Sequence, residues 1–414
     1  MANFLLFKKV LNCQDQHEYE RWRQAWDVIN RPRYKDLKWS KVQKEVLESI
    51  DQNISVEDEF QRREMKRFLY VAGKPGIGKS AVLLESAIAA AKKGMKILII
   101  CPTGQLVHSF KAQLPDCDGI ENIQIDTIHG VLKYKRPGAD GKVYWAPPSA
   151  LRKVDLILID EGSQYDDREF VRLYQCIKEQ PHSPYTALVA DSKQIQPVGS
   201  GQKCYNFCMK FDQVERKELD TVYRSKDEAH LLFLNRIREE QPDRARLLEY
   251  FGDRYWSSIE YNLKDCVEHG MKMAKKTCRP FTWLTTNNAG SAEVCQAALT
   301  HLEITAEELA EGYACDPTSK STLRIVARKG ILLRLTRNLD KTRGFVNGAL
   351  CEVEYALKGN ACFAARLIGT GNFVLVHPME EKGQRLLPCC YGYVRWQLSG
   401  AYFVTHYRPL FSKE

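Results

Sequence analysis

Short, strongly apolar segments recur through the first two thirds of the chain and alternate with amphipathic or polar stretches. Four of them are short enough for strands buried on both faces, and they cover residues 68–71, 96–101, 156–159 and 186–190. Helical stretches or loops separate them, and one predicted helix covers residues 81–93. This alternation predicts an α/β fold with a parallel sheet covered on both faces. In such sheets, ligands bind at the carboxyl ends of the strands.

The rest of the sequence predicts further parts on either side of this sheet. Residues 1–58 are polar with interleaved aromatic side chains and are predicted to be helical. A long helix is expected over residues 227–241, and a strand at 281–285 with a helix at 291–301 begins a second α/β part. Residues 323–377 predict several strands, with turns at Lys329-Gly330, Asn347-Gly348 and Gly359-Asn360. The predicted domains are residues 1–58, 59–225 (with a hairpin insert at about 131–150) and 226–414.

Composition narrows the class of protein only slightly. A chain of 414 residues with 44% hydrophobic residues can form two or three domains with full cores. Its net charge of +9 permits a polyanionic partner but is too small to demonstrate one. No apolar run of membrane-spanning length occurs, and the first residues lack the pattern of a secretory signal, so no membrane partner is expected.

The 14 cysteines do not follow the spacing of a zinc site. Free thiols favour a reducing, intracellular compartment. For this chain we expect the nucleus or a mitochondrion rather than the cytosol.

The segment GKPGIGKS at residues 73–80 fits the pattern G-x-x-x-x-G-K-[ST], and it lies between a predicted strand and a predicted helix. Its glycines allow backbone N–H groups to turn onto phosphate oxygens at the N-terminus of the helix. Lys79 is expected to reach the β- and γ-phosphates of ATP, and the Ser80 hydroxyl to bind Mg²⁺. The alternative, a glycine turn that only caps a helix, is disfavoured by the strand–turn–helix context. We expect ATP to contact Gly73, Gly76, Gly78, Lys79 and Ser80.

Two carboxylates follow the apolar segment 156–159 directly. Hydrolysis of ATP requires one acid that holds Mg²⁺ and a second that orients or deprotonates the attacking water. We expect Asp160 to have the first role and Glu161 the second. A strand that ends in Asp-Glu is common by itself, but it becomes informative when a P-loop precedes it.

Two further side chains are candidates for contacts with the γ-phosphate. Gln194 follows the segment 186–190, where its amide can hydrogen-bond both the γ-phosphate and the attacking water. Arg224 follows a further candidate strand, and an arginine at this place contributes about 10³–10⁵ in rate in proteins where it has been measured. Taken alone, Gln194 is better explained as a polar loop residue, and Arg224 as a solvated arginine.

The order of these motifs resembles the RecD/Pif-type helicases of superfamily 1B. The matching segments, between about residues 40 and 235, are GKPGIGKS, CPTG, DTIHG, DEGSQ, D-x-x-Q-I-Q-P-V and YRS, with later matches at 283–288, 335–338 and 345–348. The resemblance implies a RecA-like motor domain followed by a second, incomplete RecA-like domain. It also implies an ATP-driven motor that moves 5′ to 3′ on single-stranded DNA. Single-stranded DNA and DNA junctions are therefore the expected partners.

The resemblance also implies roles for individual residues. Gln43 matches the glutamine that reads the adenine edge, and Arg224 matches the arginine at the γ-phosphate. Three residues match positions that hold the DNA backbone, namely Thr103, Thr127 and His129. Contacts to phosphate carry no sequence information, as a translocating motor requires. Gln105 stands where the family usually has lysine, so we expect a weaker hold on DNA.

A basic segment with several aromatic residues, residues 133–145, predicts a hairpin that turns at Asp140-Gly141. In the family, a small protruding hairpin or loop separates the strands, and stacking of an aromatic ring on a base contributes about 1–3 kcal/mol. An ordinary surface hairpin explains the segment equally well.

The family pattern is lost near the end of the sequence. Residues 387–393 resemble the approach to the late motifs, but from Val394 onward neither the segment ending in Gln-Gly nor the strand ending in Ser-Arg is found. These last residues resemble a chain that is truncated before these motifs or read out of register. In either case we expect a protein that binds ATP and DNA but unwinds DNA weakly or not at all.

Two other classes of function stay open. One is a non-catalytic ATP- and DNA-binding helicase homologue, and the other is a P-loop NTPase of another kind, such as a small-molecule kinase or a signalling switch. RNA is not excluded as a partner.

Overall fold

The structure is a computed structural model of the chain. It describes residues 38–115, 117–132, 148–194, 203–240, 242–252, 262–277, 283–285, 288–315, 323–356, 362–368, 370–381 and 384–395. The described residues form two compact units, which meet in the sequence between Pro242 and Asp243. We call them the P-loop unit and the second unit. The predicted boundary at residue 225 precedes this division, and helix α10 (Glu228–Glu239) belongs to the P-loop unit.

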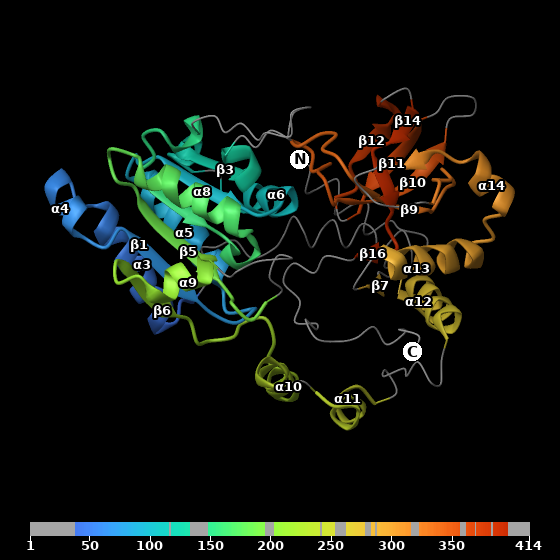
Figure 1. Cartoon of the computed structure of the whole chain (residues 1–414), viewed down its shortest axis with the longest axis horizontal. Helices are drawn as coiled ribbons and strands as arrows, with labels where there is room; N and C mark the ends of the chain where they lie inside the picture. The colour runs from blue at the N-terminus through green and yellow to red at the C-terminus, as the bar shows by residue number, and fades with distance from the viewer. Residues whose placement is uncertain are drawn as a thin grey trace. The chain divides into compact units, whose positions relative to one another are not determined.

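A six-stranded sheet forms the centre of the P-loop unit (Figure 1). Its strand order is β3-β2-β4-β5-β1-β6, and every neighbouring pair is parallel. The strands are β1 (Phe68–Ala72), β2 (Ile97–Cys101), β3 (Ile123–Thr127), β4 (Leu156–Ile159), β5 (Tyr185–Ala190) and β6 (Val214–Glu218). The four predicted strands correspond to β1, β2, β4 and β5, and the predicted parallel α/β sheet is confirmed. The edge strand β3 lacks the continuous apolar pattern because its residues are only partly buried.

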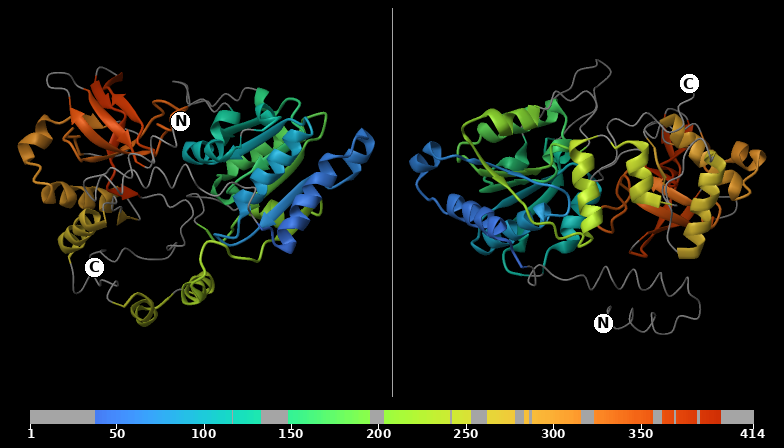
Figure 2. Two further views of the ribbon diagram at one scale, coloured as in Figure 1. Left: turned by 180° about the vertical axis from the view of Figure 1, so that it is seen from behind. Right: turned by 90° about the horizontal axis from the view of Figure 1, so that it is seen from below.

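Helices cover both faces of this sheet (Figure 1 and Figure 2). Helices α3, α5 and α6 pack on one face, and α7, α8 and α9 pack on the other. Their bounds, with those of the short helices, are α3 (Lys41–Ile54), α4 (Glu59–Glu64), α5 (Lys79–Lys92), α6 (Gly104–Gln113), η2 (Ile120–Asn122), α7 (Ile128–Val131), η3 (Ser149–Leu151), η4 (Gly162–Gln164), α8 (Asp167–Lys178) and α9 (Lys203–Lys210). Successive residues of β2 alternate between the two cores, with Ile97 and Ile99 in one and Leu98 and Ile100 in the other. Because both faces are buried, the central strands are continuously apolar in sequence.

The second unit is mainly antiparallel. Its largest sheet has the order β12-β11-β10-β9-β15, a smaller sheet has the order β13-β14-β8, and β7 and β16 form a parallel pair. The elements are α11 (Arg244–Phe251), α12 (Leu263–Thr277), β7 (Trp283–Leu284), α13 (Asn288–His301), α14 (Ala306–Glu311), β8 (Ala314–Cys315), β9 (Leu332–Leu335), β10 (Leu350–Ala356), β11 (Phe363–Leu367), β12 (Phe373–Val376), β13 (Met379–Glu381), β14 (Gln384–Leu387), β15 (Cys389–Tyr391) and β16 (Val394–Arg395).

This arrangement confirms the predicted strands between residues 323 and 377. Gly330 and Gly348 have left-handed φ angles of 85° and 87° at two of the predicted turns. A second parallel α/β part was also predicted. Among the described residues it corresponds to the parallel pair β7/β16, with α13 packed on β16 and α12 packed on α13.

Several predicted features lie outside the described residues. They are residues 1–37 of the N-terminal segment, the hairpin at 133–145, the turn at Gly359-Asn360 and the sequence from residue 396 onward. Within the described ranges, no helix combines the length and the apolar character needed to cross a bilayer.

Candidate nucleotide-binding and catalytic site

The glycines of the P-loop allow a turn that a side chain would block. Gly76 and Gly78 both have a φ of 81°, in the left-handed region that favours glycine. A Cβ on Gly76 would lie 2.6 Å from the Cβ of Arg224, and one on Gly78 would lie 2.7 Å from the Gln43 amide nitrogen. The turn therefore brings Arg224 and Gln43 directly against the P-loop, before α5 begins at Lys79.

The Lys79 ammonium group lies inside the P-loop. Its Nζ donates hydrogen bonds to the carbonyls of Gly73 (2.8 Å) and Lys74 (3.1 Å), and the residue is 7% exposed. Burial lowers the pKa of Lys79, whereas the nearby carboxylates, above all Glu161, raise it. Phosphate oxygens are better acceptors for this group than neutral carbonyls, because a charge-assisted hydrogen bond is stronger. The lysine is thus held where an anion is expected to bind.

Ser80 and Asp160 lie together at the carboxyl ends of β1 and β4. The Ser80 hydroxyl is 3.1 Å from Asp160 Oδ1 and 3.3 Å from Oδ2, and Asp160 is buried. Burial raises the pKa of Asp160 above its ordinary value, and the Glu161 carboxylate acts in the same direction. A divalent cation would compensate this buried charge. Hydroxyl and carboxylate oxygens are suitable ligands for Mg²⁺, so this pair fits the predicted metal role.

Glu161 has an unusual backbone conformation. Its φ of 50° and ψ of 46° are left-handed, a conformation that costs a residue other than glycine about 1–3 kcal/mol. Its Oε2 atom is buried and accepts no hydrogen bond from the described residues. Burial raises the pKa of Glu161, while Lys79 opposes the shift. A partly buried carboxylate with an unused oxygen, close to the predicted phosphate-binding lysine, is suited to accept a proton from water.

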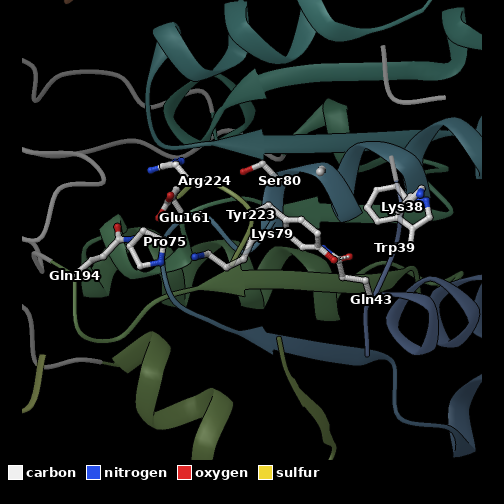
Figure 3. A pocket seen from close by; sticks show the side chains of 13 residues that line it. Lys38, Trp39, Gln43, Pro75, Lys79, Ser80, Glu161, Gln194, Tyr223 and Arg224 are labelled. Atoms are coloured by element: carbon white, nitrogen blue, oxygen red, sulfur yellow. Dashed lines mark hydrogen bonds between the residues drawn. The ribbon is translucent and has the colours of Figure 1, made fainter. Parts of the chain in front are cut away.

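A cavity of about 670 Å³ brings most of the predicted nucleotide residues together (Figure 3). Gln194 and Glu161 lie at one end of it, and Gln43 lies at the other. Arg224 lines it as well, and the backbone N–H groups of Tyr223 and Arg224 both donate to the Gly76 carbonyl (2.8 and 3.2 Å). The lining residues are Lys38, Trp39, Gln43, Pro75, Gly76, Gly78, Lys79, Ser80, Ala81, Glu161, Gln194, Tyr223 and Arg224. Asp160 and Gly73 contact this set through Ser80 and Lys79.

At the Gln43 end, hydrogen bonds fix the orientation of the Gln43 amide. Gln43 is the third residue of α3, and its Oε1 accepts from the backbone of the N-cap residue Ser40 (2.9 Å). The same oxygen accepts from the Tyr223 hydroxyl (3.0 Å), and Nε2 donates to the Ile77 carbonyl (3.0 Å). Sequence reasoning identified Gln43 but assigned no role to Tyr223 or Trp39. The position of Tyr223 directly before Arg224 is the sequence feature that could have indicated a place for Tyr223 in the site.

Tyr165 fixes the backbone at Asp160, the predicted metal-binding acid. Its buried hydroxyl lies 3.0 Å from the Ile100 carbonyl and 3.1 Å from the Asp160 carbonyl, so it bridges the ends of β2 and β4. We predict that Tyr165→Phe lowers the free energy of unfolding by about 1–3 kcal/mol, because a buried carbonyl loses its donor. Urea denaturation measures this effect. Tyr174→Phe is the control, because the Tyr174 ring packs on Phe207 in the same core, and an equal loss there would contradict the assignment.

The predicted DNA-binding residues form a second cluster, at the ends of the neighbouring strands β2 and β3. Thr103 is the N-cap of α6, and its hydroxyl accepts from the backbone of Leu106 (3.3 Å). Thr127 pairs with Cys101 across the strands and is the N-cap of α7. Gln105 lies in the first turn of α6 and His129 lies on α7. The structure thus brings all four residues to one edge of the sheet.

His129 forms an ion pair with Glu169 on α8. Glu169 also accepts a hydrogen bond from the Asp166 backbone (3.1 Å) as part of the cap of α8, so its carboxylate is held in place. The hydrogen bond to Glu169 raises the pKa of His129 above its ordinary value of 6.5. The imidazole therefore keeps its positive charge at a higher pH than a free histidine does.

We predict that His129 titrates above pH 6.5 and that Glu169→Gln moves its midpoint downward, because the amide does not stabilise the imidazolium. Histidine NMR of ¹³C-labelled protein, with the His129 signal assigned through His129→Gln, measures both midpoints. His182 serves as the internal control, since its ring contacts the Val154 carbonyl instead. An unchanged His129 midpoint in the Glu169 variant would contradict the pairing.

Comparison with known proteins agrees with this geometry. Residues 59–254 match the AAA domain family, and the P-loop, the acidic pair and the parallel sheet define a P-loop NTPase fold. The fold is similar to that of solved Pif1 helicases, and the predicted resemblance is confirmed at the level of the fold. A search of curated protein sequences finds no match.

Two solved structures of Pif1 helicases are similar to most of the chain. One is a structure of two coordinating Pif1 helicases that concerns the unwinding of forked double-stranded DNA. It is 16% identical to this chain, with a TM-score of 0.54, and the match covers 87% of this chain and 82% of the Pif1 chain. The other is a Pif1 helicase from Bacteroides with ADP-AlF3 and single-stranded DNA, also 16% identical, with a TM-score of 0.53, over 87% and 83%. At this identity, the likeness defines the fold, and the roles of individual residues stay predictions.

Proposed function

We propose that this protein is an ATP-driven motor that translocates on single-stranded DNA in the 5′-to-3′ direction, with only weak unwinding of duplex DNA. The observation that carries the proposal is the cavity at the carboxyl end of the parallel sheet. Residues from separate motifs meet there, among them Lys79, Ser80, Glu161, Gln194 and Arg224. A protein that only binds nucleotide needs no partly buried carboxylate in a strained backbone conformation at the γ-phosphate end of such a cavity.

In the proposed reaction, each side chain has a separate task. Lys79 holds the β- and γ-phosphates, and Ser80 and Asp160 would hold Mg²⁺, which screens the phosphate charge when bound. Glu161 orients the attacking water and accepts its proton, and Gln194 contacts both the water and the γ-phosphate. Arg224 balances the charge that develops on the transferred phosphoryl group.

The second cluster supports a nucleic-acid partner. Thr103 and Thr127 cap adjacent helices and His129 lies on α7 close by, so the edge formed by β2 and β3 offers hydroxyl, imidazole and backbone donors to phosphates. The Pif1 helicases with similar folds were solved with single-stranded or forked DNA, which favours DNA as the ligand.

Steady-state ATP hydrolysis with and without single-stranded DNA tests the proposal. We expect hydrolysis that requires Mg²⁺ and increases on addition of an oligodeoxynucleotide. The affinity for DNA should fall linearly with salt on logarithmic axes, since phosphate contacts release counterions. An oligoribonucleotide of the same sequence tests RNA as an alternative partner.

The second candidate is a non-catalytic homologue that binds ATP and DNA. It is favoured if fluorescent ATP binds while no phosphate is released. Direction requires a strand-displacement assay with duplexes that carry either a 5′ or a 3′ single-stranded tail. Preference for the 3′ tail would contradict the proposed polarity. Displacement from neither tail would mean that the protein is a translocase without unwinding activity or a binding protein.

A further inference from the structure

Helix α10 is joined by three polar side-chain contacts to the loops that form the phosphate end of the cavity. Asn235 accepts a hydrogen bond from Lys74 of the P-loop (2.8 Å). Glu239 pairs with Lys193, which immediately precedes Gln194 (2.6 Å). Arg238 binds Asp191, the first residue after β5, with both of its terminal nitrogens at 2.9 Å. One helix therefore contacts both the P-loop and the loop that carries Gln194.

The Arg238–Asp191 pair differs from the other two contacts in its burial. The side chains are 10% and 2% exposed, whereas those of Lys193 and Glu239 are 42% and 68% exposed. Exposed pairs contribute little, but removing one partner of a buried, bidentate pair is costly because the other charge loses its compensation. The pair is therefore the contact that fixes the position of α10 on this loop.

Asp191 in turn determines the position of Gln194. Its Oδ1 accepts from the Lys193 backbone (3.1 Å), and its carbonyl accepts from the Gln194 backbone (3.1 Å). These are the bonds of a tight turn whose first residue is an aspartate. The guanidinium of Arg238 orients the carboxylate, the carboxylate orients the turn, and the turn places Gln194 in the lining of the cavity.

We infer that Arg238 is a positioning residue for ATP hydrolysis, which acts through Asp191 on Gln194, and that α10 moves with this turn. The inference rests on the proposed function, since it assigns Gln194 to the attacking water and γ-phosphate. Helix α10 is the last helix of the P-loop unit before the chain enters the second unit. A shift of the Gln194 turn on hydrolysis is thus passed directly to the segment that connects the two units.

The first test compares Arg238→Gln with Arg236→Gln. Arg236 lies on the same helix, is exposed, and loses the same charge on substitution. For Arg238→Gln we expect kcat to fall by about 10–100-fold with the KM for ATP nearly unchanged, because small misplacements of reacting groups have effects of this size. Arg238→Lys is expected to restore only part of the rate, since lysine cannot form the bidentate pair. Arg236→Gln should equal the wild type.

A change in nucleotide affinity without a change in kcat would overturn the inference, because Arg238 would then act through its charge on the phosphate site. Equal rates in Arg238→Gln and Arg236→Gln would overturn it too. A role that is only structural would lower the melting temperature of Arg238→Gln without separating kcat from KM.

The second test needs no turnover. Hydrogen–deuterium exchange is measured with and without Mg²⁺-ATPγS, and we expect binding to slow exchange in both α5 and α10 of the wild type. In Arg238→Gln the change in α10 should be lost while that in α5 stays. A response in α5 alone in the wild type would overturn the inference and leave nucleotide binding intact. A response in neither helix would contradict the proposed function itself.

Discussion

Replacing Lys79 with alanine is expected to reduce ATP turnover by at least about a hundredfold, since loss of one preorganised donor at developing charge costs about 10²–10³ in rate. The ammonium group is buried among P-loop carbonyls and close to three acidic side chains. Without it, the carboxylates of Glu161, Asp191 and Asp160 repel the incoming phosphates. Nucleotide binding should therefore weaken together with hydrolysis, and steady-state rates with fluorescent-nucleotide titration measure the two effects.

Lys92→Ala is the matched control for this prediction. Lys92 lies in the last turn of the same helix, α5, and is exposed. The Lys92→Ala variant loses the same charge at a position outside the cavity, so its ATP turnover should equal that of the wild type. If Lys79→Ala kept turnover within tenfold of the wild type, the cavity would not be the site of hydrolysis.

The clustering of the candidate nucleotide-binding residues was largely predictable, because most of them belong to local sequence motifs. The P-loop and the Asp160-Glu161 pair each follow an apolar strand, and the carboxyl ends of parallel strands lie at the same edge of the sheet. The hydroxyl contact between Ser80 and Asp160, residues far apart in sequence, follows from that geometry. Gln43 and Arg224 required the family resemblance, since an isolated glutamine or arginine carries no pattern.

Other features depend on tertiary packing and left no pattern in the sequence. The edge strand β3 has an interrupted apolar pattern because its residues are only partly buried. Arg238 is one of several charged residues on a helix, and only the fold reveals that it is buried against Asp191. The left-handed conformation of Glu161 was not predictable either, because a glutamate does not favour it. In each of these cases tertiary structure, and not the conformational preference of the local sequence, determines the conformation or environment of the residue.

Charge is distributed unevenly within the cavity. Three acidic side chains influence Lys79, while Arg238 neutralises Asp191 from the other side. Asp160 and Glu161 both have pKa values raised by burial. Burial therefore disfavours the negative charge of these two carboxylates. A cation bound beside them would compensate this charge, as in the proposed magnesium–nucleotide complex.

Glu161→Gln is expected to separate nucleotide binding from hydrolysis. The amide keeps the size of the side chain but cannot accept a proton from water, so kcat should fall by about 10²–10⁴. The affinity for ATP should be kept or increased, because a negative charge near the γ-phosphate is removed. Single-turnover hydrolysis and a binding titration measure the two quantities. Glu85→Gln on α5 is the control for the same isosteric change, and equal rates in the two variants would exclude Glu161 as the proton acceptor.

The same substitution should stabilise the nucleotide-free protein at neutral pH. Because the folded-state pKa of Glu161 is raised, the wild type loses stability as pH rises from the ordinary carboxyl range through the raised value. The glutamine variant does not titrate, and it also removes the repulsion that raises the pKa of Asp160. Its melting temperature should therefore exceed that of the wild type at pH 7.5, and the difference should shrink toward pH 5. A difference independent of pH would mean that the carboxylate charge is not the cause. A variant that is more stable but inactive would show that Glu161 is retained for chemistry at the expense of stability.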